Sequence, residues 1–262
     1  MSGRDSAILP SLLIIGAQKA GTSSLHSWLD QHPGLTGYER KEAHYFDGGI
    51  DYTIDTYGHG PDWYASLFSG GLAQKAGAAA FESTPLYMFN PLVPARIKSL
   101  LPCVRMVAIL RDPVERAISH YYHVVQRNRE HLPLDEALRV EEERLAPVLE
   151  SGDYKHPNFI RFSYKKRGLY SEQLERYFDL FDRDQMLVIS SQELFGDPVK
   201  TVGRVLRHAG INGGTDNIVF DVKNAGKIAR KPDDDEREYL SRYFRRANER
   251  LYDLLGQRFP WT

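Results

Sequence analysis

The feature that most constrains this chain is an uninterrupted apolar run, residues 12–17, that passes directly into a glycine-containing loop. A continuous apolar run of this length is typical of a strand buried on both faces of a parallel sheet. Residues 22–31 then follow a helical pattern that stops near Pro33-Gly34. A buried strand, a glycine loop and a helix in direct succession predict an α/β fold.

The rest of the chain continues this alternation. We expect one domain over residues 1–262, with a P-loop-like parallel sheet of about four to five strands and helices on both faces. The segments 36–77 and 210–231 lack strong periodicity, and long irregular segments in a compact domain are often functional. Further strands are predicted at residues 78–82, 105–110 and 186–190, and further helices from Asp112-Pro113, at 131–151 and 171–181, from Asp197-Pro198 to 209, and at 233–255.

Charge and cysteine content narrow the class of partner. The 34 Lys and Arg residues nearly balance the 35 Asp and Glu residues, giving a formal net charge of −1. This balance predicts no nucleic-acid partner, so any anion site must be local. The single cysteine, Cys103, excludes an intrachain disulfide and a cysteine-built zinc site. No apolar run has the length of a membrane span, so we expect no membrane insertion and a cytoplasmic location.

The loop after the first strand, GAQKAGTSS from Gly16 to Ser24, has the composition of a phosphate-binding turn. Small residues let backbone N–H groups surround an anion, and the helix N-terminus adds partial positive charge. A nucleoside triphosphate loop places lysine directly after its second glycine. Here Thr22 occupies that place and the lysine lies earlier, as Lys19. An ordinary strand-to-helix turn is the alternative, but the coincidence of strand, glycines, lysine and hydroxyls favours an anion site.

A second anion site is predicted in the segment VAILRDPVERAISHYY, residues 107–122. Arg111 ends a buried strand, and Ser119 lies about two turns into the next helix, so the guanidinium and the hydroxyl can converge. The alternative is an ion pair of Arg111 with Asp112 or Glu115. The basic segment KNAGKIARKP, residues 223–232, precedes the last helix and is a candidate third contact.

The cluster KEAHYFD, residues 41–47, contains the candidate acid–base groups. In an extended chain Glu42, His44 and Phe46 would point to the same side. Either Glu42 or His44 could accept a proton from an acceptor hydroxyl. The alternative is an exposed polar strand with one buried aromatic residue.

These motifs together resemble a known family. LLIIGAQKAGTSSL is similar to the 5′-phosphosulfate loop of PAPS-dependent sulfotransferases, closest to their heparan sulfate (carbohydrate) branch, and the later motifs follow in family order. The resemblance implies PAPS as donor substrate, PAP as product and no metal. It implies that Lys19 contacts the bridging oxygen of the leaving group. The implied donor contacts are Gln18, Lys19, Ala20, Gly21, Thr22, Ser23, Ser24, Arg111, Ser119, Gly226, Lys227 and Arg230.

The same resemblance assigns the acceptor side. KE-x-HYFD is similar to the heparan sulfate 3-O-sulfotransferase motif, whose glutamate is the catalytic base. We therefore predict Glu42 as the base, with His44 as a supporting or substitute base and Lys19 as the third catalytic residue. ESTPLY, residues 82–87, resembles a family segment in which a lysine stands at the place of Ser83, and this departure argues against a polysaccharide acceptor. The predicted acceptor contacts are Lys41, Asp47, Ser83, Tyr87 and Tyr170, the last from an RGLY segment.

The resemblance implies transfer of a sulfuryl group from PAPS to a hydroxyl, less readily an amine, of a carbohydrate, lipid or other small-molecule or glycan acceptor. One alternative is an ATP-dependent P-loop phosphotransferase, which would need magnesium and a strand-end carboxylate such as Asp112. The other is a non-catalytic nucleotide-binding module. The eukaryotic carbohydrate enzymes usually carry a membrane anchor and a late disulfide, so the resemblance indicates a soluble bacterial-type member. The acceptor and the oligomeric state stay open.

Overall fold

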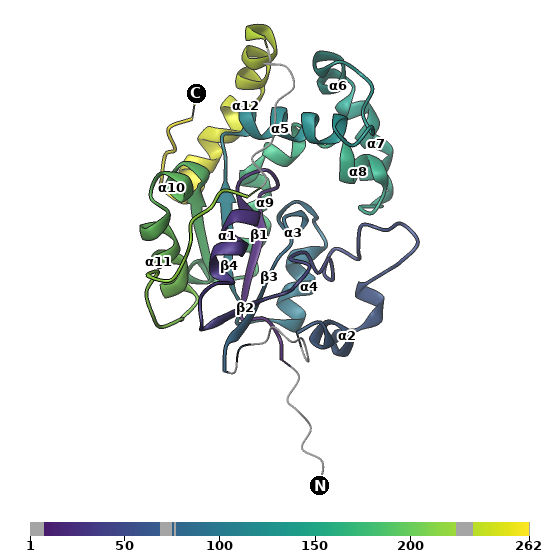
Figure 1. The fold of residues 1–262 in the computed structure, drawn as a ribbon. Helices are drawn as coiled ribbons and strands as arrows, with labels where there is room; N and C mark the ends of the chain where they lie inside the picture. Colours follow the sequence, from purple (N-terminus) through teal and green to yellow (C-terminus); the bar gives the residue numbers. More distant parts are fainter. Residues whose placement is uncertain (1–7, 69–74, 76, 224–232, 262) are drawn as a thin grey trace.

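The computed structural model describes residues 8–68, 75, 77–223 and 233–261, and Figure 1 shows their arrangement. Within these residues lies a five-stranded sheet whose strands are all parallel, in the order β2–β3–β1–β4–β5. The predicted α/β fold and parallel sheet are confirmed. The strands are β1 (Leu12–Gly16), β2 (Leu35–Gly37), β3 (Ala79–Ser83), β4 (Arg105–Leu110) and β5 (Met186–Ser190).

The two central strands are buried along almost their whole length. Every residue of β1 is buried, and in β4 only Arg105, at the start, is partly exposed. Full burial requires helices on both faces of the sheet, which is why these strands read as continuous apolar runs rather than alternating ones. Because all strands are parallel, the segments that follow β1, β3 and β4 leave the same edge of the sheet, where ligands bind in open α/β folds.

The helices gather in groups around this sheet. α1 packs on β1, β3 and α11, whereas α3 packs on β1, α4 and α9. α12 packs on α5 and α9, and Figure 1 shows α6, α7 and α8 together on the side opposite α10 and α11. The helices are α1 (Thr22–Leu29), α2 (Pro61–Ser66), α3 (Leu86–Phe89), α4 (Val93–Leu100), α5 (Pro113–Val125), α6 (Leu134–Arg139), α7 (Glu141–Ser151), α8 (Pro157–Arg161), α9 (Tyr170–Phe178), α10 (Ser191–Gly196), α11 (Pro198–His208) and α12 (Asp234–Leu255), with 3₁₀ turns η1 (Tyr57–His59), η2 (Lys166–Gly168) and η3 (Arg183–Gln185).

The predicted helix starts are present as capped termini. Asp112 Oδ1 accepts a bond from Val114 N at 2.8 Å, and Asp197 Oδ1 accepts one from Lys200 N at 3.1 Å. In both helices proline follows as the first residue, where its missing N–H costs nothing. The long last helix begins at a capping box and ends at Gly256, whose φ of 62° suits glycine.

One prediction at the level of elements was wrong, and one segment without a period contains short elements. The helix expected over residues 131–151 is two helices, because Pro133 delays the start and the chain turns at Val140. Glu141 is buried there, and its carboxylate accepts bonds from the backbone N–H groups of Lys165 and Lys166. The aperiodic segment 36–77 includes part of β2 and all of α2, which are too short to show a period.

Candidate active site

The predicted donor loop leaves β1 and is held by its neighbours on both sides. Ala17 N donates to the Ile109 carbonyl at 2.7 Å, and the Ser191 hydroxyl donates to the Ala20 carbonyl at 2.6 Å. Gly21 caps α1 with φ of 113°, and a Cβ there would lie 2.9 Å from side-chain atoms of Leu194 and Phe195. Glycine is therefore required at this point both for conformation and for space.

Cations converge on this loop. Arg111, at the end of β4, donates from Nη1 to the Lys19 carbonyl at 3.1 Å. Burial, together with the charges of Arg111 and Arg127, lowers the pKa of Lys19. Within the described residues Lys19 has no acidic partner, and Arg111 has only Glu115, at 3.9 Å. The surface thus carries positive charge that an anionic ligand would neutralise.

The hydroxyl residues of the loop differ in exposure. Thr22 and Ser24 are buried, and Ser23 is half-buried. Ser24 Oγ accepts a bond from Lys223 N at 2.9 Å, which ties the end of the described segment before residue 224 to the start of α1. Ser119 lies on α5 with little exposure. The predicted contacts Gly226, Lys227 and Arg230 lie outside the described residues.

The candidate acid–base residues form a connected chain of side chains. His44 Nδ1 lies 2.6 Å from Asp47 Oδ2, and His44 Nε2 lies 3.1 Å from Glu42 Oε2. Lys41 Nζ donates to the other Glu42 oxygen at 2.5 Å. Asp47 is buried, whereas the Glu42 side chain is 37% exposed, so Glu42 is the member of the chain that faces solvent.

Neighbouring charges fix the protonation states of Glu42 and His44 in this connected group of side chains. Burial alone would raise the pKa of Glu42, but the His44 hydrogen bond and the Lys41 ammonium outweigh it and bring the pKa to about 2. Burial would likewise lower the pKa of His44, but the carboxylates of Asp47 and Glu42 raise it to about 10. Near neutral pH Glu42 is a carboxylate and His44 an imidazolium.

The backbone around these groups is unusual. Four non-glycine residues of the described part have positive φ, and three of them are predicted catalytic or substrate residues: Lys19 (70°), Lys41 (69°) and His44 (49°). Each such residue costs on the order of 1–2 kcal/mol. The extended conformation considered for residues 42–46 is therefore wrong. Glu42 and His44 converge because the chain turns there, not because alternate residues of a strand share a face.

A residue that the sequence reasoning did not assign holds this turn in place. Glu82, at the end of β3, is fully buried and accepts bonds from the hydroxyls of Tyr64, Tyr87 and Thr84 at 2.7, 2.9 and 2.5 Å. It also accepts the backbone N–H of Ala43 at 3.2 Å. The sequence did contain a signal for this role, because a glutamate at the end of an apolar strand can be buried only if it has hydrogen-bond partners.

Three predicted acceptor contacts have different surroundings from those expected. Ser83, Tyr87 and Tyr170 are buried. The Ser83 hydroxyl lies 2.8 Å from His26 Nδ1, the Tyr87 hydroxyl serves Glu82 and the Tyr45 N–H, and the Tyr170 hydroxyl donates to the Arg111 carbonyl at 2.9 Å. These hydroxyls are engaged within the protein, and their contact with an acceptor stays a prediction. Lys41 and Asp47 remain part of the acid–base chain.

The donor loop and the acid–base chain lie within electrostatic reach of each other. His123 on α5 is affected by both. Burial and the charges of Lys19 and Arg127 lower its pKa to about 4, while Glu42 acts in the opposite direction. One imidazole therefore lies near both Lys19 and Glu42. The charges of Lys19 and Glu42 thus both act on His123, which brings the predicted donor loop and the predicted base into one region.

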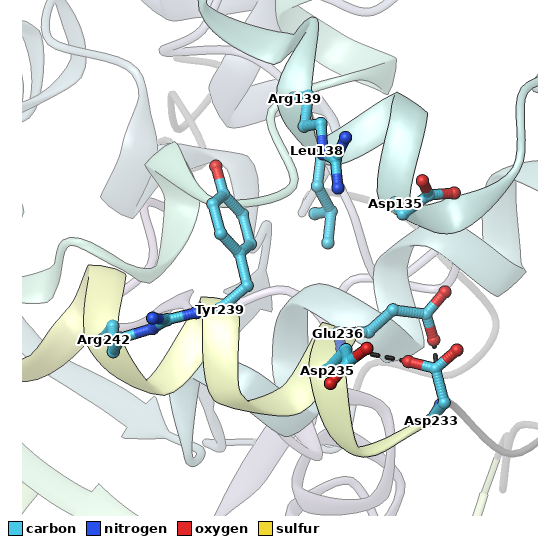
Figure 2. Close-up of a pocket in the computed structure, with 8 residues that line it drawn as sticks. All are labelled: Asp135, Leu138, Arg139, Asp233, Asp235, Glu236, Tyr239 and Arg242. Atoms are coloured by element: carbon cyan, nitrogen blue, oxygen red, sulfur yellow. Dashed lines mark hydrogen bonds between the residues drawn. The ribbon is translucent and has the colours of Figure 1, made fainter.

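A separate pocket of about 340 Å³ lies between α6 and the start of α12 (Figure 2). Its lining includes Asp135, Asp235 and the capping pair Asp233 and Glu236, which Figure 2 shows bonded to each other. Arg139 and Arg242 also line it, and with four carboxylates against two guanidiniums the net charge of the lining is negative, which disfavours phosphate and sulfonate groups. Asp112, the carboxylate that a magnesium-dependent phosphotransferase would need, caps α5 instead.

Comparison with known proteins decides the family. Residues 9–246 match the sulfotransferase domain family. A crystal structure of a sulfotransferase from Alicyclobacillus acidocaldarius is 32% identical in sequence, with a TM-score of 0.77 over 96% of this chain and 97% of that one. The chain belongs to the sulfotransferase family.

Curated sulfotransferases show the same relationship. The membrane-associated sulfotransferase kil1 of Dictyostelium discoideum is 26% identical over 97% of this chain and 66% of its own length. The heparan sulfate glucosamine 3-O-sulfotransferase 3B1 of Homo sapiens is 28% identical over 99% of this chain and 67% of its own length. The chain thus spans about two thirds of the length of these relatives. The resemblance to the heparan sulfate branch is confirmed.

The described residues of this sulfotransferase were expected to contain neither a membrane span nor a metal site. None of the helices there has the length and apolar character needed to cross a membrane. In the same residues His, Cys, Asp and Glu side chains form no group of three or more that could hold a metal ion.

Proposed function

We propose that this sulfotransferase moves a sulfuryl group from PAPS to a hydroxyl of its acceptor. The acceptor oxygen attacks sulfur, the bond from sulfur to the bridging phosphate oxygen breaks, PAP leaves, and the acceptor proton passes to Glu42. By analogy with phosphoryl transfer, such a displacement is in line and passes through a loose transition state, so the protein contributes mainly placement and charge stabilisation.

Lys19 is the group that stabilises the leaving phosphate. Its ammonium is half-buried beside Arg111, and no described acidic side chain neutralises it. Negative charge grows on the bridging oxygen as the bond to sulfur breaks. The left-handed backbone of Lys19 (φ 70°) sets the point from which its side chain leaves the loop, so a cation is already placed in the donor loop before the reaction.

Glu42 is the proposed base. A carboxylate with a pKa of about 2 is a weak base, but in a loose transition state the new bond to the acceptor is little advanced, and the proton is released late. The role of Glu42 is then to orient the hydroxyl and to take its proton as the bond forms. His44, protonated by virtue of Asp47, holds Glu42 in position and is the supporting residue.

The observation that carries the proposal is the partly exposed, ionised Glu42, whose charge acts on the same imidazole, His123, as the charge of Lys19 in the donor loop. The experiment is turnover of ³⁵S-labelled PAPS against a panel of sugar, phenol and lipid-linked alcohols, with ATP as a rival donor. We expect labelled product from PAPS only. Transfer from ATP in the presence of magnesium would show a phosphotransferase instead, and tight PAP binding without product on any acceptor would show a binding module.

A further inference from the structure

Arg167, in the 3₁₀ turn η2, is a buried cation that the proposed mechanism does not use. Its side chain is almost fully buried and lies over the Phe89 ring, with 4.9 Å from Cζ to the ring centroid. Nη2 donates to the carbonyls of Ile160 and Phe159, at the end of α8, at 2.8 and 3.3 Å. In the part of the chain that the structure describes, no carboxylate forms an ion pair with it.

The remaining Arg167 contact reaches the donor loop. Nη1 donates to Gln18 Oε1 at 2.8 Å. A guanidinium can only donate, so Gln18 must present its oxygen to Arg167, and its NH₂ group must face the other way. Among the described residues, nothing accepts a bond from Gln18 Nε2. Gln18 is half-buried and directly precedes Lys19. The two N–H groups of its amide are therefore held in the donor loop.

The charges that act on Arg167 include those of the acid–base residues. Burial and the charge of Arg116 lower the pKa of Arg167 to about 9, while Glu141, Asp47 and Glu42 act in the opposite direction. Arg167 therefore lies within reach of the acid–base chain as well as in contact with the loop. The sulfur of the donor must face the acceptor oxygen, so the acceptor side of the loop is where its sulfonate has to lie.

We propose that the Gln18 carboxamide, held in one orientation by Arg167, donates N–H bonds to the sulfonate of bound PAPS, and that Arg167 is a positioning residue for sulfuryl transfer. This proposal rests on the proposed function. In a loose transition state negative charge is spread over the three non-bridging oxygens, so donors fixed beforehand stabilise it without reorganisation. Burying Arg167 without a carboxylate partner is unfavourable, and this is the energetic consequence of holding Gln18 in one orientation.

The first test changes Gln18, whose partly exposed position tolerates substitution. Gln18→Met removes the donors and should weaken binding of PAPS about 10- to 100-fold, the range expected for hydrogen bonds to a charged group, with a parallel fall in kcat. PAP has no sulfonate, so its Kd, measured by isothermal titration calorimetry, should change less than about twofold.

Gln18→Glu separates positioning from mere structural support. The new carboxylate would neutralise Arg167 and raise Tm, but it would present a negative charge to the sulfonate and lower turnover more than Gln18→Met does. If the contact between Gln18 and Arg167 were purely structural, Gln18→Glu would raise Tm and would leave turnover unchanged or higher.

Arg167→Lys keeps the charge but loses the fork that orients Gln18. Its effect on PAPS turnover should be large in the wild-type background and nearly absent in the Gln18→Met background, since residues that act through one another are not additive. Arg176→Lys is the matched control. Arg176, which is partly buried, also donates to a backbone carbonyl, that of Phe89 at 3.3 Å, and in the described residues Nε of both Arg167 and Arg176 has no hydrogen-bond partner.

Equal losses of PAPS and PAP affinity in Gln18→Met would overturn the assignment to the sulfonate. Additive effects of Gln18→Met and Arg167→Lys would overturn the positioning role. A wild-type protein that binds neither nucleotide would instead contradict the proposed function itself, and the two failures are thus distinguishable.

Discussion

At the scale of single residues, the site depends on charged groups whose neighbours fix their protonation. Glu42 stays ionised because His44 and Lys41 bond its two oxygens, and His44 stays protonated because Asp47 lies 2.6 Å away. The left-handed backbone of Lys19, Lys41 and His44 is part of the same arrangement, since strain of this kind persists where the surroundings determine the conformation.

Glu42→Gln should lower kcat about 100-fold or more, the usual contribution of a positioned base, because the amide cannot take the acceptor proton. PAP affinity should be unchanged within about twofold, since Glu42 lies on the acceptor side. Steady-state kinetics and calorimetry measure the two effects. Glu39→Gln, an exposed glutamate nearby in the sequence, is the control. A variant that keeps wild-type kcat would remove Glu42 from the role of base.

The pH dependence of kcat/KM distinguishes the two candidate bases. If Glu42 (pKa about 2) must be ionised and His44 (pKa about 10) must be protonated, the profile should be flat between these values and fall as the pH rises through about 10. An acid limb near pH 6.5, the ordinary range of histidine, would instead indicate a neutral imidazole as base. Because Lys19, whose pKa burial lowers, must also stay protonated, His44→Asn should change the shape of the alkaline limb without removing it.

At the scale of elements, the sequence predicted what local pattern encodes. The apolar runs 12–17 and 105–110 became the central strands β1 and β4, the run 186–190 became the edge strand β5, and the Asp-Pro pairs became helix starts. The turn at residues 41–47 and the break at Val140 could not be predicted in this way. Glu82 holds the turn at residues 41–47 through its bond to Ala43, and Glu141, next to Val140, bonds Lys165 and Lys166. These partners are far apart in the sequence, so a local pattern of residues cannot predict the contacts.

Glu141 gives a prediction for the contact between α7 and η2. Burial raises its pKa to about 7 in the folded protein, well above the ordinary value of 4.5. A raised pKa stabilises the fold below about pH 4.5 and loses that contribution as the pH rises through about 7. Urea unfolding should show wild type losing about 3 kcal/mol more than Glu141→Gln over this interval, at about 1.4 kcal/mol per pKa unit. Glu143→Gln, exposed on the same helix, should behave like wild type.

At the scale of the whole molecule, anion binding is a matter of arrangement rather than of net charge. The chain carries a formal charge of only −1, yet the charges of Arg111 and Arg127 act on Lys19, and the charge of the buried Arg116 acts on the buried Arg167. The family motifs predicted Lys19 and Arg111. The buried arginines could not be predicted, because an arginine in a sequence shows neither its burial nor its lack of a carboxylate.

This concentration of positive charge makes a prediction for the unbound protein. PAP should stabilise the fold by about 2.7 kcal/mol at a concentration 100 times its Kd, which corresponds to a rise in Tm of about 5–10 °C for a protein of this size. The effect at a fixed PAP concentration should shrink as salt is raised from about 0.05 to 0.5 M, because added ions screen the partly exposed Lys19 and Arg111. Differential scanning fluorimetry measures both. Adenosine, which has the base and ribose but no phosphate, should shift Tm far less, whereas an equal, salt-independent shift with adenosine would show that binding does not depend on these cations.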